Sequence, residues 1–369
     1  MKILVTGSCG PMGTILSGCF SALGFDVHGI DSAKRTACSG SESDALRDRK
    51  LALARLPRFV DHELDTGDRR GVIDLIGAVR PDAVVHAASQ SDILAAPDAA
   101  HHADAATEAG LPGYVDASAA STLNLLEATR RACASTPFVF LSTKSIYGEG
   151  PNRIALRELE TRWEFADERY AHGIPETFPI DDCKASAVSH CKVAADVMVQ
   201  EYGHYFGLPT VCLRVGSVVG AHLVAERYGE HSRIPAGGFL ADLVRWNVEE
   251  RAFPVAAGTD RYVRDYIHAF DVARFVHEFV RSPRVGAVYN IGGGRANACS
   301  ILEAVELIED VTGKKQRILP ADEYVAGDHT CYYSDIRRAK AHYPGWDVTV
   351  GLREIIEGVA AEPLFRQAA

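Results

Sequence analysis

The chain has 369 residues, of which 47% are hydrophobic and 24% are charged, and its formal net charge is −10. This composition is typical of a soluble globular protein with one large or two closely joined α/β domains. The acidic balance argues against nucleic acid or an anionic membrane as the main partner, although a local basic pocket can still bind an anionic small molecule.

The cysteines and the apolar segments indicate the compartment. The nine cysteines are scattered and form no CxxC pair, which is typical of free thiols in a reducing environment and predicts neither a disulfide framework nor a metal site. No segment approaches the ~20 apolar residues that cross a bilayer, and the short apolar run at the N-terminus is typical of a strand rather than a signal peptide. We therefore expect a cytoplasmic protein.

The N-terminus carries a pattern typical of dinucleotide binding. A short apolar strand over 3–6 runs directly into glycines spaced three apart, an apolar helix follows, and a second strand leads to Asp31. In such a unit the glycine turn and the helix N-terminus hold a pyrophosphate, and an acid about 20 residues later binds the ribose diol. We therefore expect NAD, in preference to NADP, to bind at Gly7, Gly10, Pro11, Met12, Gly13 and Asp31.

Strand and helix signals alternate through the first half, which predicts an α/β fold with a Rossmann-type, doubly wound parallel sheet. Strand-like runs cover 3–6, 27–30, 83–86, 138–142 and 210–215, and helix-like runs cover 71–79, 121–132 and 188–206. We expect an NAD-binding domain over 1–220 and a smaller α/β substrate-binding region over 221–369. The two are expected to interleave, because 263–295 can return to the Rossmann sheet.

Four stretches lack the regular alternation of strand and helix signals. Residues 32–60 are interpreted as a polar excursion, and residues 95–114 as an inserted loop or short helix near the cofactor edge. Residues 149–182 form a long, lid-like connection, which in a compact domain is usually functional. Residues 221–262 are expected to be irregular.

Ligands of doubly wound sheets bind beyond the carboxyl ends of the strands. Four clusters of glycine or polar residues follow the predicted strands, at 7–13, 86–90, 142–145 and 214–220. The sequence therefore predicts the functional site at this edge.

These motifs resemble the extended short-chain dehydrogenases/reductases, the family of NAD-dependent nucleotide-sugar epimerases and dehydratases. The resemblance covers nearly the whole chain and rests on Thr6-Gly7, Asp31, Leu64-Asp65, His86-Ala87-Ala88, Ser142-Thr143, Tyr147-Gly148, Lys192, 264–268 (RDYIH) and 289–294 (YNIGGG). Within the family, the chain is most similar to the CDP-paratose 2-epimerase (CDP-tyvelose epimerase) branch. That similarity rests on 142–148, 150–152, 159–163, 333–335 and 343–346.

For the cofactor, the resemblance implies that the glycine turn holds the NAD pyrophosphate and that Asp31 binds the adenosine ribose. It implies that Asp65 meets the adenine amino group. It also implies that Ala87, Ala88 and Gln90 line the cofactor path.

For the substrate, the resemblance implies that Thr143 lies beside the reacting sugar carbon and that Lys192 hydrogen-bonds the nicotinamide ribose. Arg264 is implied as a ligand of the nucleotide-sugar diphosphate, since a planar guanidinium suits phosphate oxygens. Members of the family usually form homodimers through two helices, which correspond here to 121–132 and 188–206.

One family residue is absent. Members carry a tyrosine four residues before the lysine, on the same helix face, where the ammonium lowers the phenol pKa so that it can accept the hydroxyl proton. Here Val188 occupies that position, and valine cannot exchange a proton. Lys184 does not restore the pair, because Ile180 lies four residues before it.

Residues near Lys192 are alternative proton acceptors. Ser189 shares its helix face, but an unassisted serine is a poor base. His190 and Cys191 have suitable ordinary pKa values, yet they lie roughly 200° and 100° away around the helix, where packing is the simpler role.

Two more candidates lie in the loop after the strand-like run over 138–142. Lys144 acts as an acid/base if burial lowers its pKa; it could equally contact phosphate or lie on the surface. Ser145 occupies a position that touches substrate in related epimerases. The candidate catalytic residues are therefore Thr143, Lys144, Ser145 and Lys192.

The favoured hypothesis is an NAD-dependent epimerase of a nucleotide-activated sugar, acting at C2 by transient oxidation and hydride return. One alternative, motivated by the missing tyrosine, is a net dehydrogenase, reductase or dehydratase acting on a related nucleotide sugar. Another is a non-catalytic NAD-binding protein, which Val188 favours and the presence of Thr143 and Lys192 opposes. We expect a nucleotide-sugar partner and a homodimer, with no metal, nucleic acid or membrane.

Overall fold

The computed structural model describes residues 1–32, 41–88, 116–182, 187–220, 238–321 and 329–361. For residues 41–45, 116–117 and 187–190 it describes the backbone alone. The predicted loop over 95–114 and the predicted cofactor contact Gln90 lie outside these ranges. In the described ranges, no helix is both long and apolar enough to cross a membrane.

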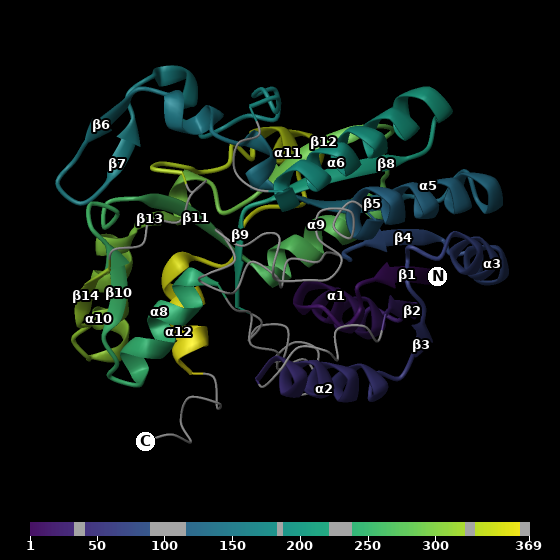
Figure 1. Ribbon diagram of the computed structural model, residues 1–369, viewed down its shortest axis with the longest axis horizontal. Helices are drawn as coiled ribbons and strands as arrows, with labels where there is room; N and C mark the ends of the chain where they lie inside the picture. Colours follow the sequence, from purple (N-terminus) through teal and green to yellow (C-terminus); the bar gives the residue numbers. More distant parts are fainter. Residues whose placement is uncertain (33–40, 89–115, 183–186, 221–237, 322–328, 362–369) are drawn as a thin grey trace.

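A seven-stranded parallel sheet forms the centre of the fold (Figure 1). Its strands, in spatial order, are β12 (Ala287–Ile291), β8 (Thr210–Val215), β5 (Phe138–Thr143), β4 (Ala83–His86), β1 (Lys2–Thr6), β2 (Asp26–Asp31) and β3 (Phe59–Glu63). The strand order reverses between β1 and β4, and ligands of such sheets bind at this switch point. The expected Rossmann-type parallel sheet is confirmed.

Helices cover both faces of this sheet because its strands are apolar on both sides. Ile3 and Val5 pack into one core and Leu4 into the other, and all three are fully buried. The first core is covered by α1 (Pro11–Ala22), α9 (Ala269–Arg281) and α11 (Arg337–His342). The second is covered by α3 (Arg69–Val79), α5 (Ser121–Ala132) and α6 (Ala187–Phe206).

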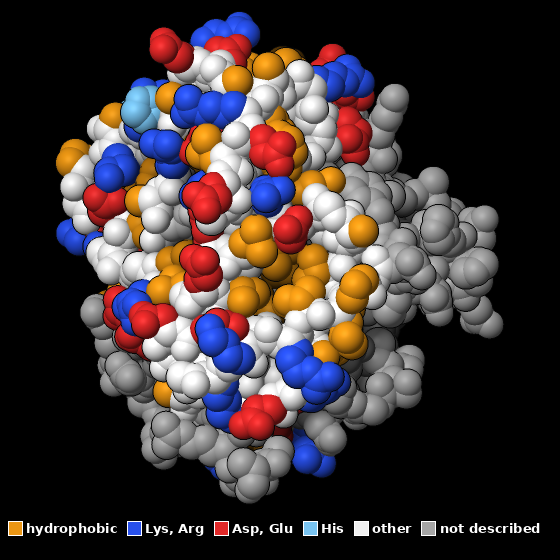
Figure 2. All heavy atoms as spheres, turned by 90° about the vertical axis from the view of Figure 1, so that its left-hand side faces the viewer, with side chains coloured by type: hydrophobic (Ala, Val, Ile, Leu, Met, Phe, Trp, Pro, Cys, Tyr) orange, Lys and Arg blue, Asp and Glu red, His pale blue; other side chains and the backbone are white. Residues whose placement is uncertain are grey.

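A smaller C-terminal part lies beside the sheet, on the left in Figure 1. Its strands are β9 (Ser217–Val219), β10 (Phe253–Ala256), β11 (Val263–His268), β13 (Ala298–Ser300) and β14 (Ile318–Ala321). Its helices are α8 (Phe239–Val248), α10 (Ile301–Thr312) and α12 (Leu352–Ala360), which share one apolar core. Figure 2 views the molecule from this side and shows hydrophobic side chains gathered around a hollow in an otherwise mixed surface.

The expectation that residues 221–262 are irregular was wrong. Residues 221–262 contain α8 and β10, and the polar stretch over 32–60 contains α2 (Ser41–Ala54) and the first residues of β3. Among the described side chains of α2, those of 46–54, the buried hydrophobic ones are Leu46 and Leu53, seven residues apart. Glycines around α8 hid its apolar spacing, which buries Leu240, Leu243 and Val244.

The connection over 149–182 contains a hairpin, β6 (Leu156–Glu158) and β7 (Trp163–Phe165). The segment between these strands is tied to the first turn of α10. Thr161 Oγ1 donates to Glu303 Oε1 at 2.7 Å, Arg162 pairs with Glu303 at 3.3 Å, and Ser300 Oγ donates to the Thr161 carbonyl at 2.7 Å. The hairpin is thus fastened to the smaller part of the molecule.

Candidate functional site

The glycine turn brings β1, α1 and the end of β4 into close contact. Gly7 has a φ of +67°, and the Gly10 N–H donates to its carbonyl at 2.8 Å. A Cβ on Gly7 would lie 2.6 Å from Ala88 Cα, and one on Gly13 would lie 1.9 Å from the Gly7 oxygen. Only glycine fits at these two positions without moving backbone.

The N-terminus of α1 can accept an anion. Gly10 caps the helix without a side-chain hydrogen bond, Pro11 stands in the first turn, and the first turn holds no acidic residue. Met12 packs against the core beneath the turn. The N–H groups and the helix dipole therefore suit a pyrophosphate, and the cradle fits NAD.

Asp31 lies against this turn, as its position at the carboxyl end of β2 requires. Its Oδ2 accepts the Cys9 N–H at 2.9 Å. Asp65, the predicted adenine contact, follows β3. The N–H of its neighbour Leu64 donates to the Asp31 carbonyl at 3.1 Å, which holds the ends of β2 and β3 together. Asp65 Oδ1 accepts the Gly67 N–H at 2.8 Å. The structure thus brings the two acids to neighbouring strand ends.

The end of β4 is held by hydrogen bonds to Thr6. Ala87 N–H donates to the Thr6 carbonyl at 3.2 Å, and Ala88 N–H donates to Thr6 Oγ1 at 3.3 Å. His86 bridges Thr6 Oγ1 at 2.7 Å and Thr122 Oγ1 at 3.0 Å. Burial, and secondarily the charge of Lys192, lowers the pKa of His86 to about 3. His86 is therefore neutral and structural.

Lys192 is buried at 7% exposure beside β5. Its Nζ donates to the Leu141 carbonyl at 2.9 Å and lies 4.9 Å from the centre of the Phe140 ring. Burial lowers the pKa of Lys192 to about 8, and Asp196 partly offsets this. The carbonyl that Lys192 binds lies two residues before Thr143, so α6 holds its lysine against the strand that ends at Thr143.

The turn after β5 arranges three candidate residues. Thr143 caps a 3₁₀ turn over Lys144–Tyr147: its Oγ1 accepts the Ser145 N–H at 3.2 Å and donates to Ser145 Oγ at 3.3 Å. The two hydroxyls are half-buried and form a short chain. Lys144, between them in sequence, turns toward the smaller part of the molecule.

Other titratable groups near Lys192 are engaged or unsuited to accept a proton. Asp196 pairs with Arg214 at 3.1 Å and accepts Ser142 Oγ at 2.7 Å. Tyr147 donates to Asn290 Oδ1 at 2.6 Å, and burial raises its pKa to about 12. Burial also raises the pKa of the Cys191 thiol. The side chains of 188–190 lie outside the described residues.

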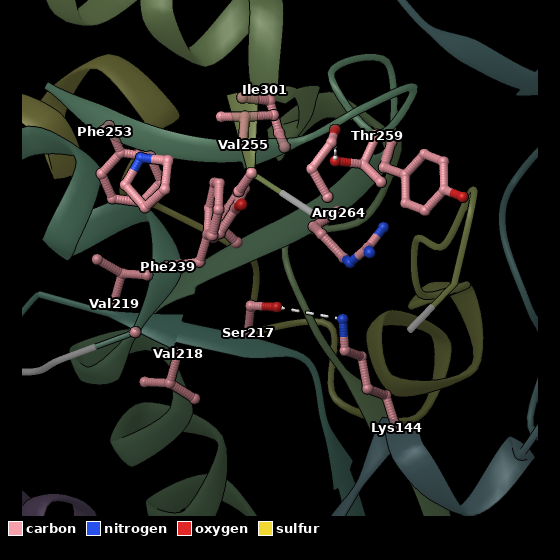
Figure 3. A pocket seen from close by; sticks show the side chains of 16 residues that line it. Lys144, Ser217, Val218, Val219, Phe239, Phe253, Val255, Thr259, Arg264 and Ile301 are labelled. Carbon is pink, nitrogen blue, oxygen red and sulfur yellow. Dashed lines mark hydrogen bonds between the residues drawn. The ribbon is translucent and has the colours of Figure 1, made fainter. Parts of the chain in front are cut away.

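A cavity of about 610 Å³ lies between β5 and the smaller part. Lys144 and Arg264 point into it, and Lys144 Nζ donates to Ser217 Oγ at 3.3 Å (Figure 3). Phe239 and Phe253 form part of an apolar wall. Among the described residues that line the cavity, none is acidic. The cavity therefore suits a ligand with an anionic part and an apolar part.

The sequence interpretation missed several contributors to this site. Ser217, Tyr332 and Asp265 surround Lys144, but they come from three distant segments. Asp196 could have been recognised from the sequence as a neighbour of Lys192, because it lies four residues after Lys192 on the same helix face.

A profile of the NAD dependent epimerase/dehydratase family matches residues 3–292. The chain belongs to this family. It is thus a member of an NAD-dependent enzyme family, and NAD, expected from the glycine turn, is its cofactor. Family membership confirms the expected relationship to the nucleotide-sugar epimerases and dehydratases.

Two curated relatives span almost the whole chain. A CDP-paratose 2-epimerase from Salmonella typhi is 27% identical over 343 residues, which is 92% of each chain. The dTDP-glucose 4,6-dehydratase 1 of Escherichia coli (strain K12) is 26% identical over 376 residues, covering 97% of this chain and 92% of the relative. The relatives thus include both an epimerase and a dehydratase.

Solved structures share the fold. UDP-glucuronic acid 4-epimerase from Bacillus cereus, in complex with UDP-glucuronic acid and NAD, superposes with a TM-score of 0.75 at 21% identity. The UDP-glucose 4-epimerase of Thermus thermophilus, in complex with NAD, gives a TM-score of 0.70 at 24% identity. Both comparisons cover 100% of each chain.

Proposed function

We propose that this family member is an epimerase of a nucleotide-activated sugar and that it acts at C2 of the sugar. The observation that carries the proposal is the cavity that joins Lys144 and Arg264 to an apolar wall without any described acidic lining residue. A nucleoside diphosphate has a matching anionic and an aromatic part. The position C2 is supported by the similarity to a CDP-paratose 2-epimerase over 92% of the chain.

The residues of the cofactor cradle have separate roles in this proposal. Bound NAD would supply the acceptor for a hydride from the reacting sugar carbon and the source of its return. The N–H groups of Met12 and Gly13, in the first turn of α1, would hold the pyrophosphate, and Asp31 would hold the adenosine ribose. Asp65 would meet the adenine, and Lys192 the nicotinamide ribose. Arg264 would bind the diphosphate of the sugar nucleotide.

The proton of the sugar hydroxyl needs an acceptor, since Val188 cannot serve. We assign this role to Lys192, because its pKa of about 8 lets the neutral amine form near neutral pH. Thr143 and Ser145 offer a relay of two hydroxyls between the substrate and the interior. The raised pKa values of Cys191 and Tyr147 argue against these two as the base.

The test is a search for turnover with a panel of nucleotide sugars, followed by nuclear magnetic resonance of the products. A sugar deuterated at C2 should invert and keep its label, because the hydride returns to the carbon it left. No NADH should accumulate. Failure to interconvert any pair of C2 epimers contradicts the proposal.

A second candidate is a net dehydratase, which the 26% identity to a dTDP-glucose 4,6-dehydratase over 97% of the chain favours. The same assay separates the two activities. A dehydratase product is lighter by one water, whereas an epimer has the mass of its substrate. A net dehydrogenase would instead accumulate NADH.

We further propose that the protein is a cytoplasmic homodimer joined through α5 and α6. The helix α6 exposes Val197, Tyr205 and Phe206, with exposed fractions of 43%, 80% and 45%. The two helices already pack together, and Tyr202 Oη donates to Glu127 Oε1 at 2.9 Å. Tyr205→Glu should convert a dimer to a monomer in analytical ultracentrifugation; a wild-type monomer contradicts the proposal.

A further inference from the structure

Two cations converge on the cavity from different parts of the fold. Lys144 comes from the turn after β5, and Arg264 comes from β11 in the smaller part. Both line the same 610 Å³ cavity and point into it in Figure 3. Arg264 donates to the Val263 carbonyl at 2.8 Å and lies 5.7 Å from the Tyr262 ring, which directs its guanidinium along the cavity wall.

Lys144 lies beside a buried acidic side chain, that of Asp265. Asp265 is fully buried; its Oδ2 accepts the N–H groups of Gly294 at 3.2 Å and Ser334 at 3.0 Å. Its Oδ1 accepts no hydrogen bond from the described residues. Burial raises the pKa of Asp265, and the positive charge of Lys144 is the largest opposing influence. Lys144 therefore has a fixed acidic neighbour, and the two side chains attract each other when both are charged.

An aromatic ring adds to this effect. Nζ of Lys144 lies 5.0 Å from the centre of the Tyr332 ring, within the range of a cation–π contact. Burial and the neighbouring charge of Asp265 raise the pKa of Tyr332, so its ring stays neutral. Asp265 and Tyr332 therefore hold the Lys144 side chain in place at the edge of the cavity.

We propose that Lys144 is a second cationic ligand of the substrate diphosphate, paired with Arg264, and that Asp265 and Ser217 position it for this role. The inference rests on the proposed function, since it takes the cavity as the nucleotide-sugar site. An ammonium supplies a compact charge with three donors, whereas the guanidinium binds phosphate oxygens in pairs. Together they bracket an anion that carries more than one charge.

The test measures binding, so it does not depend on turnover. CDP, UDP and dTDP are titrated into the NAD-saturated protein by calorimetry, and the tightest is compared with its nucleoside. In Lys144→Met, affinity for the nucleoside diphosphate should fall about tenfold or more, as for loss of a charge-assisted hydrogen bond. Affinity for the nucleoside should change by less than about twofold, since no phosphate is involved.

Three further variants separate binding from folding. Lys315→Met removes an exposed lysine that pairs with Glu309, and it should leave both affinities unchanged. Lys144→Arg keeps the charge and should retain most of the diphosphate affinity. Lys144→Met combined with Asp265→Asn removes the buried charge as well. Its diphosphate affinity should stay low if Lys144 itself contacts phosphate.

Each outcome decides the inference. An unchanged diphosphate affinity in Lys144→Met overturns it, as does an equal loss for nucleoside and diphosphate, or recovery in the double variant. A hundredfold loss of kcat in Lys144→Met with unchanged diphosphate affinity overturns it in favour of an acid/base role. Wild-type protein that binds diphosphates but turns over no nucleotide sugar contradicts the proposed function alone. Wild-type protein that binds no nucleoside diphosphate contradicts this inference.

Discussion

Adding one methyl group to the glycine turn should cost NAD affinity. In Gly13→Ala the new Cβ would lie 1.9 Å from the Gly7 oxygen and 2.6 Å from the Gly7 carbonyl carbon. Both are backbone atoms, so α1 must retreat from the turn by more than about 1 Å to reach an ordinary contact. Such overpacking costs about 1–3 kcal/mol. Because 1.4 kcal/mol is a factor of ten, NAD affinity should fall about tenfold to a hundredfold.

Gly77→Ala is the matched control, because it makes the same chemical change within α3, where a Cβ meets no atom within 4 Å. Replacing a glycine inside a helix should stabilise the fold by about 1 kcal/mol. NAD is titrated into both variants by calorimetry, and thermal unfolding is followed without NAD. Equal NAD affinity in the two variants would refute the close-packing argument.

Three other changes test the cofactor site and the buried groups. Asp31→Ala should lower NAD affinity at least tenfold, because the carboxylate no longer binds the adenosine ribose. The ratio of NADP to NAD affinity should rise, because the carboxylate no longer repels the additional phosphate of NADP. An unchanged ratio in paired titrations of NAD and NADP contradicts this prediction. The kcat of the wild type should rise with pH through about 8, because the neutral form of Lys192 accumulates there. Lys192→Met should lose activity, and the ionisation near pH 8 should disappear from the profile. A flat wild-type profile argues against Lys192 as the base. The free energy of unfolding should fall by about 1.4 kcal/mol per pH unit below pH 6.5. In this range His86 binds a proton in the unfolded chain, whereas in the folded protein its pKa of about 3 keeps it neutral. Urea unfolding at a series of pH values measures this slope, which His86→Gln should flatten; an equal slope in that variant contradicts the assignment.

The central strands could be predicted because burial on both faces leaves a continuous apolar pattern. In β1, Ile3, Leu4 and Val5 are all fully buried, so the sequence carries no polar interruption. The edge strand β3 could not be predicted in this way. It exposes Val60, and none of its residues is fully buried, so its hydrogen bonds to β2 hold it in the sheet without an apolar signal.

The residues of the candidate site also divide into those with a local sequence signal and those without one. Gly7, Gly13 and Asp31 are recognisable because a turn and a strand end are local features. The neighbours of Lys144 are not recognisable, because Asp265 and Tyr332 reach it only after the smaller part has folded against β5. Sequence reasoning therefore left Lys144 with three open roles, and only its surroundings favour one of them.

The two lysines of the site are distinguished by their acidic neighbours. Near Lys192, Asp196 is already occupied by Arg214 and Ser142, so little of its charge is left to hold a proton on the amine. Near Lys144, Asp265 has an oxygen that accepts no hydrogen bond from the described residues; burial raises the pKa of Asp265, and the charge of Lys144 opposes this rise. Environments that push pKa values apart assign different roles to groups of the same type. In the proposed roles, Lys192 exchanges a proton near neutral pH because burial lowers its pKa to about 8, and Lys144, beside Asp265, binds phosphate.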